Sequence, residues 1–238
     1  MKTKLMVVTT IAFGAMALAV SAMTDAEMRK RIEGSAYIFD DPSASDAELR
    51  YVLRCCEYDT NRFLSAMQAV AVEKPKLSDY ICQELGKYGN ASCLPFLYQN
   101  MTNSAARSYA ASSMLKIEGL TSNSIERMGM YLLGPGGHHR DKTYVCGEML
   151  SLAAAGGITN ALGVLSVEKA LQYASTGNPY VQQLDEDICR YNPAYVMSKR
   201  RLSVLRAAVE RGIHRNQIAY VTNAINELVS YPEADLPD

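Results

Sequence analysis

The spacing of apolar residues along this chain is the feature that most restricts its fold. Apolar side chains recur at i, i+3, i+4 and i+7, a period that places them on one face of an α-helix. A clear first example is the run Leu49, Val52, Leu53 and Cys56. Sustained alternation of β-branched residues, which is typical of strands, is absent from the sequence. We therefore expect an all-α fold of roughly ten helices joined by brief polar turns.

Short motifs predict several helix ends. Ser45 and Glu48 have the spacing of a capping box, in which a hydroxyl and a carboxylate satisfy the free amides of the first turn. The pairs Asn178-Pro179 and Asn192-Pro193 are typical of an N-cap followed by proline at the first helical position. Gly212 stands where a helix is expected to end.

The apolar spacing itself repeats at a fixed interval. Four-residue sets at offsets 0, +3, +4 and +7 begin 29, 35 and 35 residues apart. Such intervals are typical of stacked helical hairpins, in which each hairpin buries its apolar face against its neighbours. We therefore expect an α-solenoid of antiparallel hairpins over residues 45–230, with a globular helical bundle as the alternative. The sets are Ser78, Ile81, Cys82 and Leu85; Arg107, Ala110, Ala111 and Met114; Lys142, Val145, Cys146 and Met149; and Gly177, Tyr180, Val181 and Leu184.

Small and apolar residues stand at defined positions between Leu85 and Gly119. A Leu-Gly pair is followed by a further glycine, a Leu-Pro pair, and an arginine with two alanines at +3 and +4. These residues are Leu85-Gly86, Gly89, Leu94-Pro95, Arg107 and Ala110-Ala111, closed by Met114, Leu115 and Gly119. The pattern resembles a HEAT-like repeat of the short bacterial type, although the turn Met101-Thr102-Asn103-Ser104 lacks the acidic residue frequent in that family. The resemblance implies a binding or scaffolding surface and transfers no catalytic residues.

The first 22 residues have the parts of a secretory signal peptide. Lys2 and Lys4 precede an apolar run from Leu5 to Val20, and Val20-Ser21-Ala22 supplies small residues for a signal peptidase. The run of about 16 residues is short for a membrane span, which needs about 20. We expect cleavage after Ala22, with retention as an anchor as the alternative. The mature protein is then exported, periplasmic or secreted, and not inserted in a membrane.

The ends of the mature chain and its charge complete this organisation. Residues 23–44 are expected to form an N-terminal segment, and residues 231–238 an extended acidic tail. With 24 basic and 25 acidic residues the chain lacks an overall basic field, which speaks against a nucleic-acid partner. Basic residues cluster from Lys199 to Arg215, close to the acidic run Asp185–Asp187. A solvated face paired with these acids is expected, with a patch for an anionic partner as the alternative.

Six cysteines in an exported protein invite a disulfide interpretation. Most of them stand inside apolar helical patterns, and the adjacent pair Cys55-Cys56 would strain to close on itself. Buried free thiols are therefore favoured over one or more bridges. No Cys/His spacing suits zinc.

The glycine-rich segment from Gly134 to Asp141 carries two of the three histidines. His138, His139 and Asp141 could ligate a metal, but adjacent histidines with one acid are a weak signal. We favour a flexible surface loop in which Asp141 caps the following helix, and we expect no metal and no cofactor. The alternative function is an exported hydrolase or metal-dependent enzyme using His138 or His139, for which no GxSxG or HExxH motif is present.

Tyrosine dominates the aromatic residues, with 15 Tyr, 4 Phe and no Trp. Tyrosine is enriched at protein interfaces because it joins a large ring to a hydroxyl. The sequence therefore predicts a non-enzymatic, exported helical-repeat protein that binds another protein or a cell-envelope component. The candidate contact residues are Tyr88, Arg107, Tyr109, His139 and Tyr144.

Overall fold

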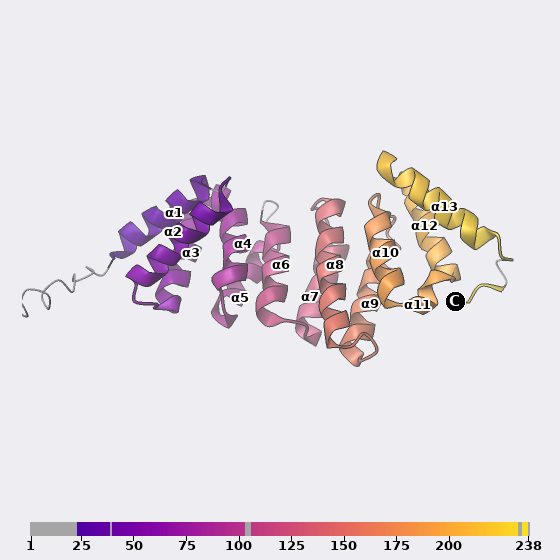
Figure 1. The fold of residues 1–238 in the computed structure, drawn as a ribbon, viewed down its shortest axis with the longest axis horizontal. Coiled ribbons are helices and arrows are strands. Elements are labelled where there is room, and N and C mark those ends of the chain that lie inside the picture. The colour runs from indigo at the N-terminus through magenta and orange to yellow at the C-terminus, as the bar shows by residue number, and fades with distance from the viewer. Residues whose placement is uncertain (1–22, 39, 103–105, 233–234, 238) are drawn as a thin grey trace, which may run out of the picture. The chain divides into compact units, whose positions relative to one another are not determined.

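The computed structural model describes residues 23–38, 40–102, 106–232 and 235–237, and the predicted signal peptide lies outside these ranges. Within them the regular structure is helical throughout, with thirteen α-helices and three short 3₁₀-helices (Figure 1). The all-α prediction is confirmed, and the number of described helices exceeds the roughly ten expected. None of these helices is long and apolar enough to span a membrane. The helices divide into two units between Glu73 and Lys74.

The first unit is a group of three helices around one apolar core. Helix α1 packs against both α2 and α3, and its Met28 and Ile32 are fully buried with Leu49 and Phe63. Helix α1 lies in the segment 23–44, where the apolar spacing indicated no helix. The helices are α1 (Asp25–Tyr37), α2 (Pro42–Cys55) and α3 (Thr60–Glu73).

The predicted capping box at Ser45 is wrong, because α2 begins one turn earlier. Asp41 is the N-cap, and its Oδ1 accepts hydrogen bonds from the amides of Ser43 and Ala44, each at 3.1 Å. Pro42 then occupies the first helical position, where no intrahelical donor is lost. Ser45 is buried, and its hydroxyl donates to the carbonyl of Ser35 at 3.1 Å.

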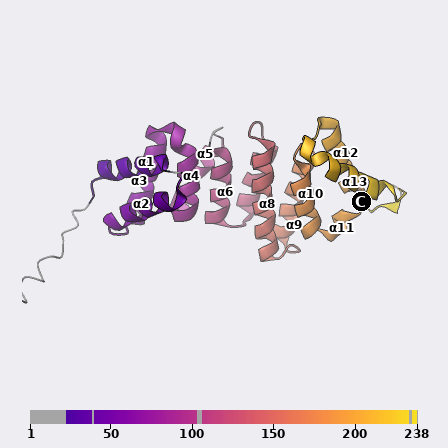
Figure 2. The same ribbon diagram turned by 45° about the horizontal axis from the view of Figure 1, so that its top comes forward.

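The second unit is built from helices that pack on partners close to them in the chain. Helix α4 packs on α6, α6 on α8 and α8 on α10, while α7 packs on α9 and α9 also contacts α8 and α10 (Figures 1 and 2). The helices are α4 (Ser78–Tyr88), α5 (Leu94–Asn100), α6 (Arg107–Glu118), α7 (Ser122–Leu133), α8 (His139–Gly156), α9 (Ala161–Ala174), α10 (Val181–Tyr191), α11 (Pro193–Val196), α12 (Lys199–Arg211) and α13 (Ile218–Val229), with 3₁₀-helices at Pro75–Leu77, Ala91–Cys93 and Arg215–Gln217.

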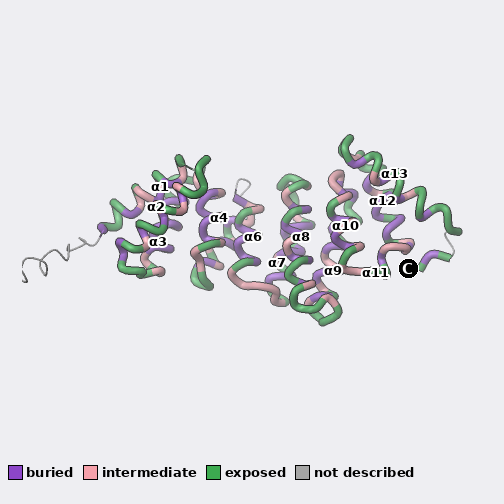
Figure 3. Tube along the Cα trace, viewed as in Figure 1, coloured by how far each residue is buried: buried purple, intermediate pink, exposed green. Residues whose placement is uncertain are grey.

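Residues at the repeated offsets form the core of this unit. All eight residues at +4 and +7 are fully buried, and each pair lies on one of the alternate helices α4, α6, α8 and α10. Buried and exposed positions accordingly alternate along each helix (Figure 3). The residues are Cys82 and Leu85, Ala111 and Met114, Cys146 and Met149, and Val181 and Leu184. The repeated spacing therefore marks equivalent core positions on helices that pack together.

An ion pair lies in the core between α10, α12 and α13. The Arg201 guanidinium donates from Nε and Nη2 to both carboxylate oxygens of Asp185, at 2.9 to 3.3 Å. The Tyr220 hydroxyl donates to Asp185 Oδ2 at 2.7 Å. The side chains of Arg201 and Asp185 are 7% and 0% exposed. The expectation of a solvated basic face is thus wrong for Arg201, although Arg200 forms an exposed pair with Glu168.

Several predicted helix ends differ in detail from the structure. Helix α10 begins at Val181, after Asn178 has accepted the amide of Tyr180 in a turn and donated to Thr143 Oγ1 at 2.6 Å. Pro193 does open α11, and Gly212 ends α12 with φ +94°. In the predicted extended tail, Leu236 is buried and the carbonyl of Pro237 accepts the amide of Lys199 at 2.8 Å. The end of the tail therefore satisfies a free amide in the first turn of α12.

All six cysteines are free thiols, and all except the half-buried Cys189 are buried. Burial raises the pKa of Cys82 to about 12 and that of Cys189 to about 11, which keeps both thiols protonated and unreactive near neutral pH.

We expect protein denatured without reductant to titrate close to all six thiols with Ellman's reagent. The folded protein should react slowly, because five of the six thiols are buried and the sixth is half-buried, which keeps the reagent from reaching them. Recovery of no free thiol after denaturation would contradict the structure and indicate disulfides.

Candidate functional site

The glycine-rich loop before α8 is held by two cationic side chains. Arg107 donates from Nη1 to the carbonyl of Pro135 at 2.8 Å and from Nη2 to the carbonyl of Thr102 at 3.0 Å. The buried Lys142 ammonium donates to the carbonyls of Leu132 and Gly134 at 3.0 and 2.8 Å. The loop predicted to be flexible is therefore anchored, and Arg107, expected to contact a partner, binds the chain's own backbone.

The histidines of the loop stand at the beginning of α8. His138 is the N-cap residue, so the prediction that Asp141 caps this helix is wrong; Asp141 lies in the first turn. His139 Nδ1 lies 3.4 Å from the Tyr173 hydroxyl, and the two rings stack at 6.3 Å. Burial lowers the pKa of His139, and the positive charges of Lys142 and Arg211 lower it further. In the described part of the chain, no group of three or more potential metal ligands occurs.

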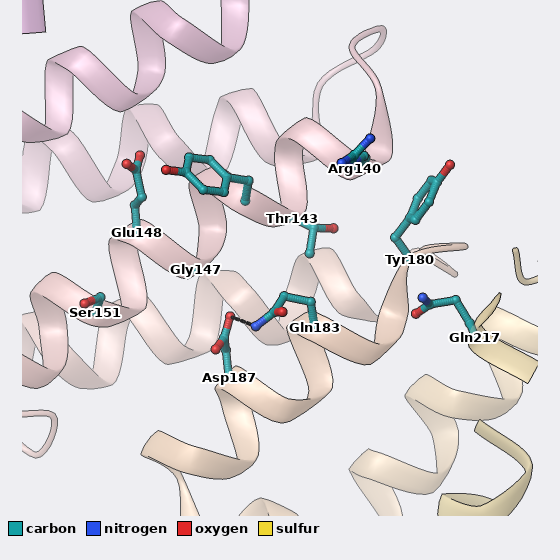
Figure 4. A pocket seen from close by; sticks show the side chains of 10 residues that line it. Arg140, Thr143, Gly147, Glu148, Ser151, Tyr180, Gln183, Asp187 and Gln217 are labelled. Atoms are coloured by element: carbon teal, nitrogen blue, oxygen red, sulfur yellow. Dashed lines mark hydrogen bonds between the residues drawn. The ribbon is translucent and has the colours of Figure 1, made fainter. Parts of the chain in front are cut away.

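A groove of about 570 Å³ runs between α8 and α10 (Figure 4). Both helices run in the same direction along it. Thr143, near the start of α8, is hydrogen-bonded to Asn178 just before α10, and Gly147, one turn further along α8, lies close to Asp187 within α10. The lining from Arg140 to Ser151 spans about 16 Å of helix at 1.5 Å per residue. The lining residues are Arg140, Thr143, Tyr144, Gly147, Glu148, Ser151, Tyr180, Gln183, Asp187 and Gln217.

The end of the groove nearest the helix N-termini carries Arg140, Tyr180 and Gln217 (Figure 4). The ring of Tyr180 stacks on His214 at 5.1 Å, and Gln217 Oε1 accepts the amide of Gln182 at 2.8 Å. Arg140 and Tyr180 also line a second hollow of about 450 Å³, which includes the loop residues 137–141. The groove therefore shares lining residues with the hollow beside the glycine-rich loop that carries His138 and His139.

The opposite end of the groove is acidic, with Glu148 on α8 and Asp187 on α10 (Figure 4). Asp187 accepts a hydrogen bond from Gln183 Nε2 at 3.2 Å. A Cβ atom at Gly147 would lie 2.9 Å from Asp187 Oδ2, so only glycine leaves room for this carboxylate against α8. The arrangement gives one groove with a cationic and an acidic end.

The structure separates the five predicted contact residues. Tyr144 lines the groove and is 66% exposed, and His139 lines the adjoining hollow. Tyr109 is exposed on α6, at the same offset from Arg107 as Tyr144 has from Lys142. Tyr88 is half-buried at the end of α4, and neither it nor Arg107 lines the groove.

The sequence interpretation missed both carboxylates and Tyr180. The available signal was Gly147, because an isolated glycine inside a helical pattern often marks a close approach of another group. Glu148 follows that glycine directly, whereas Asp187 was assigned to an acidic run thought to be solvated.

Comparison of the chain with protein-family models, with curated proteins and with solved structures found no match. The structure itself defines the class of protein: an all-helical chain with a tyrosine-bearing groove between two parallel helices.

Proposed function

We propose that this chain is an exported, non-enzymatic helical-repeat protein that binds another protein in the groove between α8 and α10. The observation that carries the proposal is Tyr144, which is 66% exposed beside a groove about 16 Å long lined by amide, hydroxyl and charged side chains. Exposed tyrosine next to polar groups is typical of surfaces that bind proteins. A length of about 16 Å matches about five residues of extended chain at 3.3 Å each.

The proposal includes an α-solenoid of HEAT-like hairpins. It is supported by the buried residues at repeated offsets, by the packing of α4, α6, α8 and α10 each on the next, and by the resemblance of residues 85–119 to a HEAT-like repeat. In such an architecture equivalent helices line one face, which becomes the binding surface. The hairpins of this arrangement are α5–α6, α7–α8 and α9–α10.

The alternative of a hydrolase or metal-dependent enzyme depends on His138 or His139. The ring of His139 packs against Tyr173, whose hydroxyl donates to the carbonyl of His139 at 3.1 Å. Tyr173 is buried, so its contact with the half-buried His139 contributes to the packing between α8 and α9, although His139 also lines the hollow beside the groove. We therefore favour binding over catalysis. The proposed export depends on the signal-peptide pattern of residues 1–22.

Site-specific photocrosslinking in the native cells tests the proposal. The photoreactive residue p-benzoylphenylalanine would replace Tyr144 in the groove or, as a control, Met130, which is comparably exposed at 64% on α7 outside the groove. We expect a discrete protein adduct from position 144 and none of the same mass from position 130. The proposal fails if position 144 yields no protein adduct, or if both positions yield the same one.

A further inference from the structure

We propose that the groove takes an extended protein segment that presents a basic side chain, preferably arginine, to Glu148 and Asp187. This inference depends on the proposed function, since it assumes that the groove binds protein, and it adds the chemistry of the bound segment.

Glu148 has an incompletely paired carboxylate. Its Oε2 is buried and has no hydrogen-bond partner among the described residues, although the side chain as a whole remains 23% exposed. Its Oε1 lies 4.0 Å from Lys116 Nζ, which is beyond hydrogen-bond distance. Most buried polar atoms have a partner, so this carboxylate, whose side chain lines the groove and is partly exposed, keeps capacity for a further donor.

Asp187 adds a second carboxylate whose hydrogen bonding is also incomplete. Its side chain is only 10% exposed, and its Oδ1 lies 3.6 Å from Arg190 Nη1, longer than an ordinary N–H···O hydrogen bond. Its Oδ2 accepts one amide hydrogen bond, from Gln183. Gly147 lets this carboxylate lie against α8. The two acids are thus paired only loosely with side chains that are themselves mostly exposed.

The polarity of the groove defines how the segment would lie. The acidic residues stand in the C-terminal halves of α8 and α10, whereas Arg140 stands at the N-terminal end of α8 (Figure 4). A segment with its basic side chain at the acidic end keeps that charge away from Arg140. The side-chain amide of Gln183 makes one hydrogen bond, to Asp187, and keeps capacity for the backbone of the segment, while Tyr144 offers a ring to the cation.

Arginine suits these two acids better than lysine does. Its guanidinium is planar and carries five N–H donors in a fork that can bind one carboxylate through two parallel hydrogen bonds. Hydrogen bonds between ionised groups are also shorter and stronger than neutral ones.

Fluorescence anisotropy with three pools of labelled heptapeptides tests the inference. The central residue is Arg, Gln or Glu, and the other six positions are randomised among uncharged residues. We expect the Arg pool to bind the wild-type protein at least about tenfold more tightly than the Gln pool, as charge-assisted hydrogen bonds predict, and the Glu pool to bind most weakly.

Charge-neutral variants assign that preference to the groove. Glu148→Gln and Asp187→Asn should each reduce binding of the Arg pool while leaving the Gln pool unchanged, which also shows that the variants are folded. Glu186→Gln removes the same charge from α10 outside the groove and should keep the preference. Equal binding of the Arg and Gln pools, or a preference that survives in both groove variants, overturns the inference. The Tyr144 crosslink tests protein binding separately, so an adduct with no Arg preference rejects only this inference.

Discussion

Asp185→Ala is expected to lower the free energy of unfolding by about 3 to 5 kcal/mol, because it leaves the Arg201 guanidinium buried without its counter-charge. Burial by itself would lower the pKa of Arg201, but hydrogen bonds and negative charge from Asp185 hold that pKa above its ordinary value. Arginine is not deprotonated in proteins, so the guanidinium keeps its charge in the core after Asp185 is removed. Urea denaturation followed by circular dichroism measures the loss.

A double variant separates the ion pair from the packing around it. Replacing a buried pair by apolar residues of similar volume is often neutral, so Asp185→Leu combined with Arg201→Met should recover much of the stability lost by Asp185→Ala. As a surface control, Glu168→Ala removes the partner of Arg200, and exposed ion pairs contribute only about 0 to 1 kcal/mol. A loss from Asp185→Ala no greater than that of Glu168→Ala would contradict the buried position of the pair.

This ion pair also shows where the sequence stops being informative. The sequence predicted that basic residues near position 200 pair with acids near 185, and Arg201 does bind Asp185. It could not predict that the pair is buried, because the adjacent Arg200 is equally basic and binds Glu168 in solvent. Which of two neighbouring arginines enters the core depends on their 100° separation around α12 and on where α10 and α13 lie.

The helical class and the core residues were predictable because both follow from the i, i+3, i+4 and i+7 spacing of apolar residues. Residues such as Cys146 and Met149 were identified by spacing alone and are fully buried. The first residues of α2 and α10 were predicted wrongly because several nearby residues can each act as the N-cap of one helix. For α2, Asp41 followed by Pro42 starts the helix one turn before Ser45.

The groove was largely beyond prediction from the sequence. Tyr144 was selected for its position on a second helix, but Glu148 and Asp187 come from helices about 40 residues apart. Only the close approach of α8 and α10 at Gly147 brings these two acids to one groove. A repeat pattern predicts which residues face the core, whereas the chemistry of the exposed faces varies from one repeat to the next.

Ala110→Leu is expected to destabilise the protein by about 1 to 3 kcal/mol, because the added methylenes enter a seam that is already filled. Ala110 is fully buried on α6, which packs closely on α4. A small residue at this position lets neighbouring helix axes approach, so a larger one must shift either its own rotamer or the neighbouring helix. Thermal and urea denaturation would measure the change.

The matched control is Ala155→Leu, the same chemical change at an exposed position on α8. Surface substitutions away from special features usually stay within about 0.5 kcal/mol, so this variant should resemble the wild type. The two variants differ only in whether the enlarged side chain meets a packed neighbour. If Ala110→Leu were as silent as Ala155→Leu, the alanines would not set the spacing of α4 and α6, and the repeat register built on Arg107, Ala110 and Ala111 would be wrong.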